Sequence, residues 1–323
     1  MEVKRRDSNI ELLRIIIMFM ILLLHANFLA FERPEGYSFT SFSRCFAEAF
    51  TLTPVNIFVL ITGFYGTRFS IRKSMNLIFQ VLFCVIPISL LLIGCGIIDF
   101  KYHYFAFHRY WFINAYIALI ALTPILNAAA ERFTNKEFKT VLITFYVIAL
   151  VSTLFGLEGI EIKRGSFILW FMFLYLLGRY VKTNQPSCSK KVLILIILIS
   201  CLCNAIVLFT GQNPDYVNPF VLIQSVCTLL LFNQFKISSQ FINKVAISTT
   251  MVYLVNLHPA LWEIEQQWLL SLYQQFSVPL FLLYTVLSCV AIFVFAIVYD
   301  KLRLYAWSML SSMFKKDNAV SSK

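Results

Sequence analysis

Three ionisable residues near the N-terminus are spaced so that one helix would carry them on one face. Glu11 and Arg14 are three positions apart, and His25 lies 11 positions beyond Arg14. In an α-helix that separation is ~20° more than three full turns, so Arg14 and His25 share a face and lie ~16 Å apart along the axis. Glu11 lies one turn before Arg14 and can pair with it. A histidine suits general-base chemistry near neutrality, but an interfacial Glu–Arg pair with a core histidine explains the pattern too.

A second segment whose residues could take part in chemistry runs from Asn56 to Thr62 and Gly63, with another glycine at position 66. Glycines at the end of a helix allow a sharp turn and a close backbone approach. The basic residues that follow are Arg68, Arg72 and Lys73. They would suit an anionic ligand, and the accumulation of positive charge in cytoplasmic loops would also explain them.

The composition restricts the class of protein that carries these residues. Of 323 residues, 59% are hydrophobic and only 13% are charged, and the mean hydropathy is +0.77. So few charges cannot cover the surface of a soluble domain, and a disordered chain would be far less apolar. The sequence therefore predicts an all-α, polytopic transmembrane bundle.

Ten apolar runs are long enough to span a bilayer. They lie at about 12–31, 45–66, 75–98, 111–127, 138–156, 166–182, 191–210, 219–235, 244–262 and 278–299. With the N-terminus inside, 21 of the 27 Lys and Arg residues fall in cytoplasmic segments. The positive-inside rule then predicts that both termini are cytoplasmic. We expect one membrane domain over residues 1–323, ending in a short cytoplasmic tail at about 300–323.

The net charge of +11 is explained by those loops, so the sequence does not predict a nucleic-acid partner. The 8 Cys lie mostly in apolar runs without a CxxC pair, and we predict no metal site. The first apolar run lacks a small-residue cleavage site, so we expect a transmembrane helix there instead of a signal peptide.

The quoted segments resemble the integral-membrane acyltransferase-3 family. The resemblance rests on Asn9-x-Glu11-Leu-Leu-Arg14, on the spacing from Arg14 to His25, and on Asn56-Ile-Phe-Val-Leu-Ile-Thr62-Gly63-Phe64. Tyr110-Trp111-Phe112 and Tyr253-Leu254-Val255 fit as well. Members transfer acyl groups, commonly acetyl, to surface polysaccharides, peptidoglycan, lipid-linked sugars or small molecules.

The resemblance implies roles for particular residues. Arg14 and His25 would be essential, with His25 catalytic and Glu11 beside Arg14, and the Thr62-Gly63-Phe64 turn with the basic residues after it would lie near the acyl-CoA. The chain departs from the family where Thr62 replaces the usual Ser, and where Asn256 takes the place of a His, with His258 two residues on. The residues expected on the acceptor side are Asn56, Trp111, Asn114, Tyr253, Asn256 and His258.

Two functions follow as alternatives. The first is a membrane O-acyltransferase that moves an acetyl or similar group from acyl-CoA to a hydroxyl of a cell-surface or lipid-linked glycan, with His25 as base or relay. The second is an exporter of polysaccharide or lipid-linked sugar. Acyl-CoA would be a co-substrate, no cofactor would be permanently bound, and the composition suggests the plasma membrane of a bacterium. The sequence does not indicate an oligomeric state.

Overall fold

The computed structural model describes residues 6–28, 37–105, 107–157, 168–212 and 214–320, and the regular structure in these ranges is helical. The chain forms two compact units that interleave along the sequence. Unit 1 comprises residues 1–69 and 111–243, and unit 2 comprises residues 70–110 and 244–323. The short helix α10 (Gln240–Ala246) crosses the boundary.

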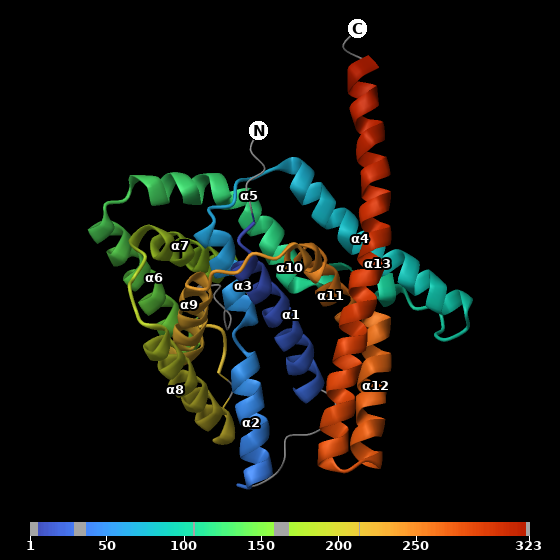
Figure 1. Ribbon diagram of the computed structural model, residues 1–323, viewed down its shortest axis with the longest axis horizontal. Helices are drawn as coiled ribbons and strands as arrows, with labels where there is room; N and C mark the ends of the chain where they lie inside the picture. The colour runs from blue at the N-terminus through green and yellow to red at the C-terminus, as the bar shows by residue number, and fades with distance from the viewer. Residues whose placement is uncertain (1–5, 29–36, 106, 158–167, 213, 321–323) are drawn as a thin grey trace. The chain divides into compact units, whose positions relative to one another are not determined.

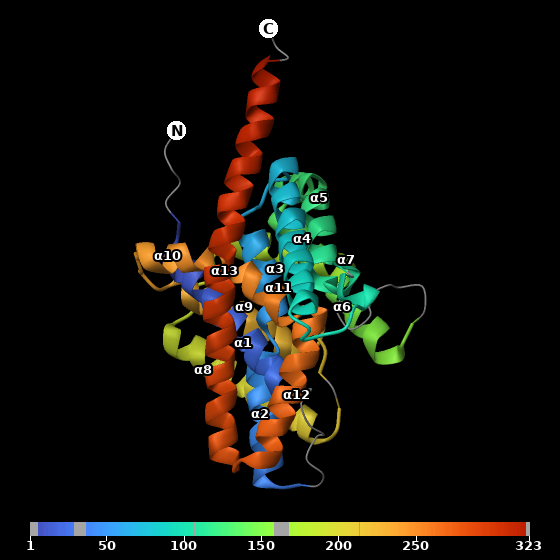
Figure 2. The ribbon, with the colours of Figure 1, turned by 90° about the vertical axis from the view of Figure 1, so that its right-hand side faces the viewer.

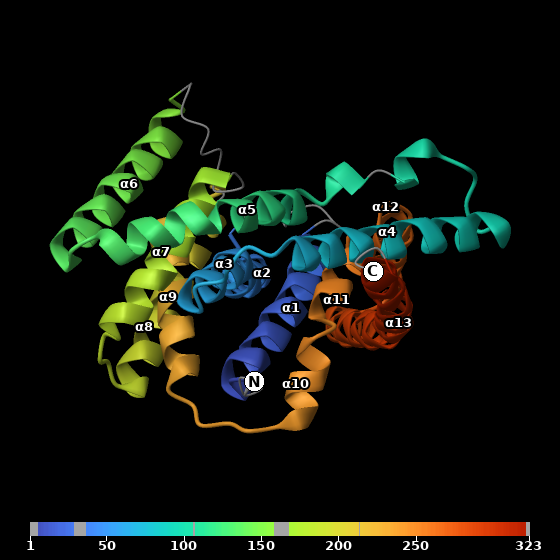
Figure 3. The ribbon, with the colours of Figure 1, turned by 90° about the horizontal axis from the view of Figure 1, so that it is seen from above.

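Unit 1 holds the predicted catalytic helix. Its helices are α1 (Ser8–Phe28), α2 (Phe39–Thr51), α3 (Pro54–Phe64), α5 (Trp111–Arg132), α6 (Asn135–Phe155), α7 (Ile168–Asn184), α8 (Lys190–Phe209) and α9 (Pro219–Asn233). α3 packs most extensively against α7, and α1 contacts α2, α3 and α9. Leu60, Trp170, Phe171 and Leu174 are fully buried between these helices. The bend between α5 and α6 is visible in Figure 3.

Unit 2 is built around one long C-terminal helix. Its elements are α4 (Ile71–Gly94), the 3-10 turns η1 (Tyr102–Phe105) and η2 (Phe107–Arg109), α11 (Thr249–Asn256), α12 (Pro259–Gln275) and α13 (Val278–Val320). α13 contacts α4, α11 and α12, and Figure 2 shows it as one uninterrupted helix.

Local sequence signals place several helix ends. Pro54 occupies the first turn of α3, where a missing N–H costs nothing, and so separates α3 from α2. Thr134 and Glu137 form a reciprocal capping box at the start of α6. Gly156 ends α6 in the left-handed conformation at φ 60°. These signals let the chain reverse direction between long apolar helices.

The contact between α3 and α7 depends on two glycines. A Cβ at Gly63 would collide with the carbonyl oxygen of Tyr175, and one at Gly178 would collide with the carbonyl oxygen of Leu60. The two backbones therefore touch where any side chain would separate them, as small residues permit in membrane helix pairs. Gly63 therefore allows the close packing of α3 against α7, with its Cα facing the backbone of α7.

Within the described ranges, seven helical segments are long and apolar enough to cross a membrane. They are Ser8–Ala26, Ser41–Phe64, Ile71–Gly94, Trp111–Arg132, Asn135–Phe155, Lys190–Phe209 and Val278–Ser312. They correspond to seven of the ten predicted spans. The spans predicted at 166–182 and 219–235 appear as shorter helices, α7 with 17 residues and α9 with 15. The count of ten and the cytoplasmic termini stay predictions.

The span predicted at 244–262 is not one continuous helix. The chain there forms α10, α11 and the start of α12, with a break at Leu257 and His258 before Pro259. Proline at the first helical position starts a new helix and cannot continue the old one. α12 also occupies residues that we expected to form an outer loop.

The predicted polar tail likewise begins within regular structure. α13 continues to Val320, and Asp300 and Arg303 are buried at 0% and 2% exposure. Arg303 donates to both carboxylate oxygens of Asp300 at 2.8 and 3.0 Å. It also donates to Asn76 of α4, and Gln80 donates to Asp300. A buried ion pair with further hydrogen bonds ties α13 to α4.

Replacing Gly63 with Ala should destabilise the protein by about 1–3 kcal/mol or more, because the added Cβ forces α3 and α7 apart. The matched control is Gly94→Ala, since a Cβ at Gly94 meets no atom within 4 Å. Thermal unfolding of the detergent-purified variants measures both. Equal melting temperatures for the two variants would contradict the close-packing role.

Candidate functional site

Two polar side chains anchor the first turn of α1 to the last turn of α9 and to the segment that follows it. Asn9 donates to the carbonyl oxygen of Phe232 at 2.9 Å. The hydroxyl of Ser8 accepts from the backbone N–H of Ser239 at 3.0 Å. Both residues are buried. Since α1 is rigid, these bonds fix the position of every residue that follows on it.

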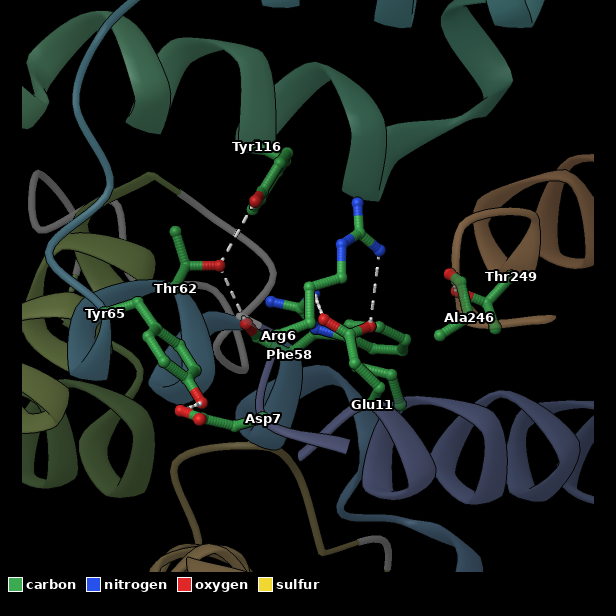
Figure 4. Close-up of polar contacts among 10 residues, drawn as sticks. Arg6, Asp7, Glu11, Phe58, Thr62, Tyr65, Tyr116, Ala246 and Thr249 are labelled. Carbon is green, nitrogen blue, oxygen red and sulfur yellow. Dashed lines mark hydrogen bonds and ion pairs between the residues drawn. The ribbon is translucent and has the colours of Figure 1, made fainter. Parts of the chain in front are cut away.

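Glu11 holds Arg14 one helical turn away. Arg14 Nη1 donates to Glu11 Oε1 at 3.0 Å, and the side chain of Glu11 is only 9% exposed. Arg6 Nη1 lies 3.9 Å from the other carboxylate oxygen of Glu11, and the Glu11 pairing is drawn in Figure 4. The predicted Glu11–Arg14 pair is therefore present. One nearly buried carboxylate lies between two guanidinium groups.

Arg14 keeps hydrogen-bonding capacity after this pairing. A guanidinium carries five N–H donors, and among the described residues Glu11 is the only hydrogen-bond partner of Arg14. The side chain is 31% exposed. Such a group can bind a phosphate or carboxylate, or polarise a carbonyl oxygen.

His25 lies on the same uninterrupted helix as Arg14. α1 runs from Ser8 to Phe28 without a break, so the predicted shared face follows from regular helix geometry, with ~16 Å between the two positions. The His25 side chain is half-buried. Its catalytic role stays a prediction.

The end of α3 meets the start of α1 through Tyr65. Its hydroxyl donates to Asp7 Oδ2 at 2.7 Å. Burial and this hydrogen bond raise the pKa of the Tyr65 phenol above its ordinary value. The phenol therefore stays protonated and acts as a donor that ties α3 to α1.

The Thr62 hydroxyl is already committed to protein partners. It donates to the Phe58 carbonyl oxygen at 2.9 Å and lies 3.2 Å from the hydroxyl of Tyr116 (Figure 4). A hydroxyl has a single hydrogen, so Tyr116 donates to Thr62. Thr62 places Tyr116 of α5 beside the candidate site.

The turn after α3 is held from two helices. The carbonyl oxygen of Thr67 accepts from Asn127 Nδ2 at 3.2 Å, and the Tyr175 hydroxyl lies 3.1 Å from that carbonyl oxygen and 2.8 Å from Asn127 Oδ1. Gly66 has φ 60°, which favours glycine. Its Cα lies against the guanidinium of Arg179, where a Cβ would collide. The turn that precedes Arg68 is therefore a fixed structure.

Asn56 has a structural position. Its Nδ2 donates to the Tyr216 carbonyl oxygen at 2.9 Å, and its Oδ1 accepts from Trp170 Nε1 at 3.0 Å. Its exposure is 0%. Both ends of the amide are used to join α3 to α7 and to the segment before α9. Asn56 therefore joins helices, and its contact with an acceptor stays a prediction.

The predicted basic cluster is divided between the units. Arg14 and Arg68 belong to unit 1, as do Thr62 and Gly63, which were predicted to lie near the donor. Arg72 and Lys73 lie in the first turn of α4 in unit 2. Arg68, Arg72 and Lys73 are exposed. The structure gives them solvated ends and no acidic partner among the described residues.

The predicted acceptor-side residues are divided in the same way. Trp111 and Asn114 lie in the first turn of α5 in unit 1, with Trp111 half-buried against Phe171 and Tyr216 and Asn114 exposed. Asn56 is in unit 1 as well, whereas three buried members are in unit 2, namely Tyr253, Asn256 and His258. Asn256 Nδ2 donates to Glu265 Oε2 at 3.0 Å.

His258 caps a helix. Its Nδ1 accepts from the backbone N–H groups of Ala260 and Leu261 at 3.3 and 3.4 Å. Nε2 must then carry the proton, and it points toward the Val85 carbonyl oxygen and Ser89 Oγ. A ring whose lone pair is used in this way cannot also accept a substrate proton. This geometry argues against a base at His258.

Several residues of the site were not identified from the sequence. Asp7, Tyr116, Asn127 and Arg179 contribute through partners far away in the chain, so no local pattern marks them. Arg6 was counted only as a cytoplasmic charge. Within the described ranges, no group of three or more His, Cys, Asp or Glu side chains could hold a metal ion.

Comparison with known proteins adds one match. A family model described as an acyltransferase domain, that of the acyltransferase-3 family, matches residues 7–300 and so extends over both units. Neither the curated proteins nor the solved structures contain a significant match to the sequence.

Replacing His258 with Ala should cost about 1–2 kcal/mol of stability, because α12 loses its cap. His258→Asn should recover most of that loss, since the Asn oxygen can accept from the same N–H groups. Thermal unfolding and acyl transfer per folded molecule measure the two effects. A stable His258→Asn protein without activity would mean that the imidazole takes part in catalysis.

Proposed function

The chain belongs to the acyltransferase-3 family, and from this premise we propose that it transfers an acetyl or similar acyl group from acyl-CoA to a hydroxyl of a cell-surface or lipid-linked glycan. The family match supports a membrane acyltransferase, and seven apolar helices agree with a membrane location. Donor, acceptor and the residue roles below are the proposal. The plasma membrane of a bacterium is its proposed setting.

The observation that carries the proposal is the state of Arg14. Glu11 fixes its guanidinium through one nitrogen and leaves the others available. An arginine in this state can bind the phosphate oxygens of the acyl donor. His25 lies ~16 Å further along the same helix face. The long pantetheine arm of CoA separates its phosphates from its thioester, which suits such a spacing.

The reaction needs a base for the acceptor hydroxyl. In our proposal His25 accepts the proton of the glycan hydroxyl while that oxygen attacks the thioester carbonyl carbon. The tetrahedral intermediate collapses as the C–S bond breaks. The proton held by His25 passes to the departing CoA thiolate. The products are the glycan ester and CoA with a free thiol.

The exporter remains the alternative function. A transport path would be favoured by broken helices in corresponding positions of two halves. The described breaks lie between α2 and α3 and around α11, in different units. The measurement that separates the two is the acetyl content of the glycan in a deletion strain. Loss of acetyl with normal amounts of exported glycan supports transfer, and retained acetyl with loss of surface glycan supports export.

Arg14→Ala and His25→Ala should each lower acyl transfer by at least about 100-fold, because an oriented cation and a general base are lost. The matched control is Arg6→Ala, which removes the other, more exposed partner of Glu11 and should stay near wild type. Transfer from acetyl-CoA is measured with each variant purified in detergent. Near-normal activity of either site variant would exclude the proposed site.

Arg68→Ala or Arg72→Ala should raise the KM for acetyl-CoA about tenfold, since charge-assisted contacts to phosphate contribute roughly 1.5–3 kcal/mol each. The KM for the acceptor should change much less. Lys139→Ala is the control, because Lys139 is exposed on α6, in another segment predicted to be cytoplasmic. Equal effects on both KM values would contradict a donor-specific role.

A further inference from the structure

A cavity of 420 Å³ lies in unit 2 among α11, α12 and α13. These three helices contact one another, and α12 and α13 run side by side (Figure 1). Pockets for small molecules commonly enclose about 300–1,000 Å³. The apolar members of the wall are Val255, Leu261, Ile264, Ile292 and Phe295. The cavity therefore offers a largely apolar surface to a ligand of small-molecule size.

One charged side chain stands in the wall of this apolar cavity. Glu265 lines it at only 9% exposure. Asn256 donates to its Oε2 at 3.0 Å, and this is the only hydrogen bond of the carboxylate among the described residues. Oε1 thus has no donor there, and protein atoms do not fully enclose it. The wall of the cavity therefore contains an acceptor oxygen that the protein leaves unused.

Glu265 also has no cationic partner among the residues that the structure describes. A carboxylate in an apolar wall loses its hydration, and one amide hydrogen bond does not replace it. Such a group either keeps a proton or takes a positive charge beside it. Unit 2 has two buried carboxylates in its described part, and the other, Asp300, is neutralised by Arg303. Only Glu265 is left without a counter-charge from the protein.

The other polar side chains of the wall already bind each other or the backbone. Trp268 Nε1 donates to Ser288 Oγ at 3.1 Å, and that hydroxyl donates its single hydrogen to the Tyr284 carbonyl oxygen at 2.8 Å. The first bond ties the indole of α12 to α13 and so holds its ring in the wall. Aromatic faces attract cations, and Phe295 supplies a second ring. The unused oxygen of Glu265 and the two rings therefore favour the same sign of charge.

We propose that this cavity binds an amphiphilic amine, a small molecule with an apolar body and a single ammonium group. The ammonium donates to Glu265 Oε1, and the body packs against the apolar wall. A neutral chain would leave the carboxylate without a counter-charge. A zwitterionic lipid headgroup would bring a phosphate to a wall that contains no Lys, Arg or His. The site goes beyond the proposed acyl transfer and does not depend on it.

The test is direct binding of tritiated 4-phenylbutylamine to the full-length protein in a nonionic detergent, measured by equilibrium dialysis against detergent alone. The amine stays protonated at neutral pH, as that of a lysine does. We expect saturable binding of one molecule per chain. Unlabelled 4-phenylbutanol has the same body without the charge and should compete at least about tenfold less well. Equal competition by the alcohol would mean that the cavity takes any apolar chain, a lipid tail included, and would overturn the proposal.

A matched pair of variants tests the charge. Glu265→Gln keeps the shape of the side chain and an oxygen that can accept from Asn256, so it should weaken binding of the amine at least about tenfold without affecting the alcohol. Glu263→Gln is the control, because that carboxylate of α12 accepts from Tyr104 and lies 3.8 Å from Lys101, and it does not line the cavity. It should bind the amine as the wild type does. Equal affinities of the two variants would contradict the contact with Glu265.

A second pair tests the cavity while Glu265 stays in place. Ala291 lines the cavity and is exposed, so Ala291→Phe fills the space at little cost in stability and should abolish saturable binding. The control is Val290→Phe, at a neighbouring exposed position of α13 outside the wall, and it should bind normally. Binding is compared in variants that melt at the wild-type temperature. Unchanged affinity in Ala291→Phe would overturn the assignment to this cavity, and neither result depends on acyl transfer.

Discussion

The backbone contact between α3 and α7 positions most of the features that carry chemistry in unit 1. Gly63 and Gly178 let the backbones of the two helices touch. This close approach brings two side chains of α7 to the turn after α3. Tyr175 reaches the carbonyl oxygen of Thr67, and Arg179 reaches Gly66. Larger residues at either glycine would move the turn away from α7. The turn that leads to Arg68 would then lose the contacts that fix it.

The first helix adds a second, independent constraint. Asn9 attaches its start to the last turn of α9, and Ser8 attaches it to the segment after α9. Tyr65, which follows α3, binds Asp7 just before α1. Because both attachments lie at the start of α1, they fix the position of the helix along its axis and its rotation about that axis. Glu11 and Arg14 therefore have defined positions. His25 then occupies a position that depends only on the regularity of the helix. A site built on a rigid element of this kind needs few further contacts to orient it.

The features that could be predicted from the sequence are the local ones. Long apolar runs gave seven of the expected helices, and the three-residue spacing of Glu11 and Arg14 gave their ion pair. The span at 244–262 was expected from a continuous apolar run, and the proline within it, which made that span uncertain, marks the break before Pro259. The partners of Asn56 could not be predicted, since they are 114 and 160 residues away in the chain. The same holds for Tyr116 beside Thr62, 54 residues away.

The hydrogen-bonding capacity that remains after folding separates structural polar residues from ligand-binding ones. Both ends of the Asn56 amide are occupied, the hydrogen of Thr62 is committed to Phe58, and the lone pair of His258 caps α12. These three polar groups were expected to meet substrates, and protein partners already satisfy them. Among the described residues, Arg14 keeps guanidinium donors that no protein group uses. Because an unpaired, partly buried cation is costly unless an anion meets it, this remaining capacity suits an anionic ligand at the start of α1.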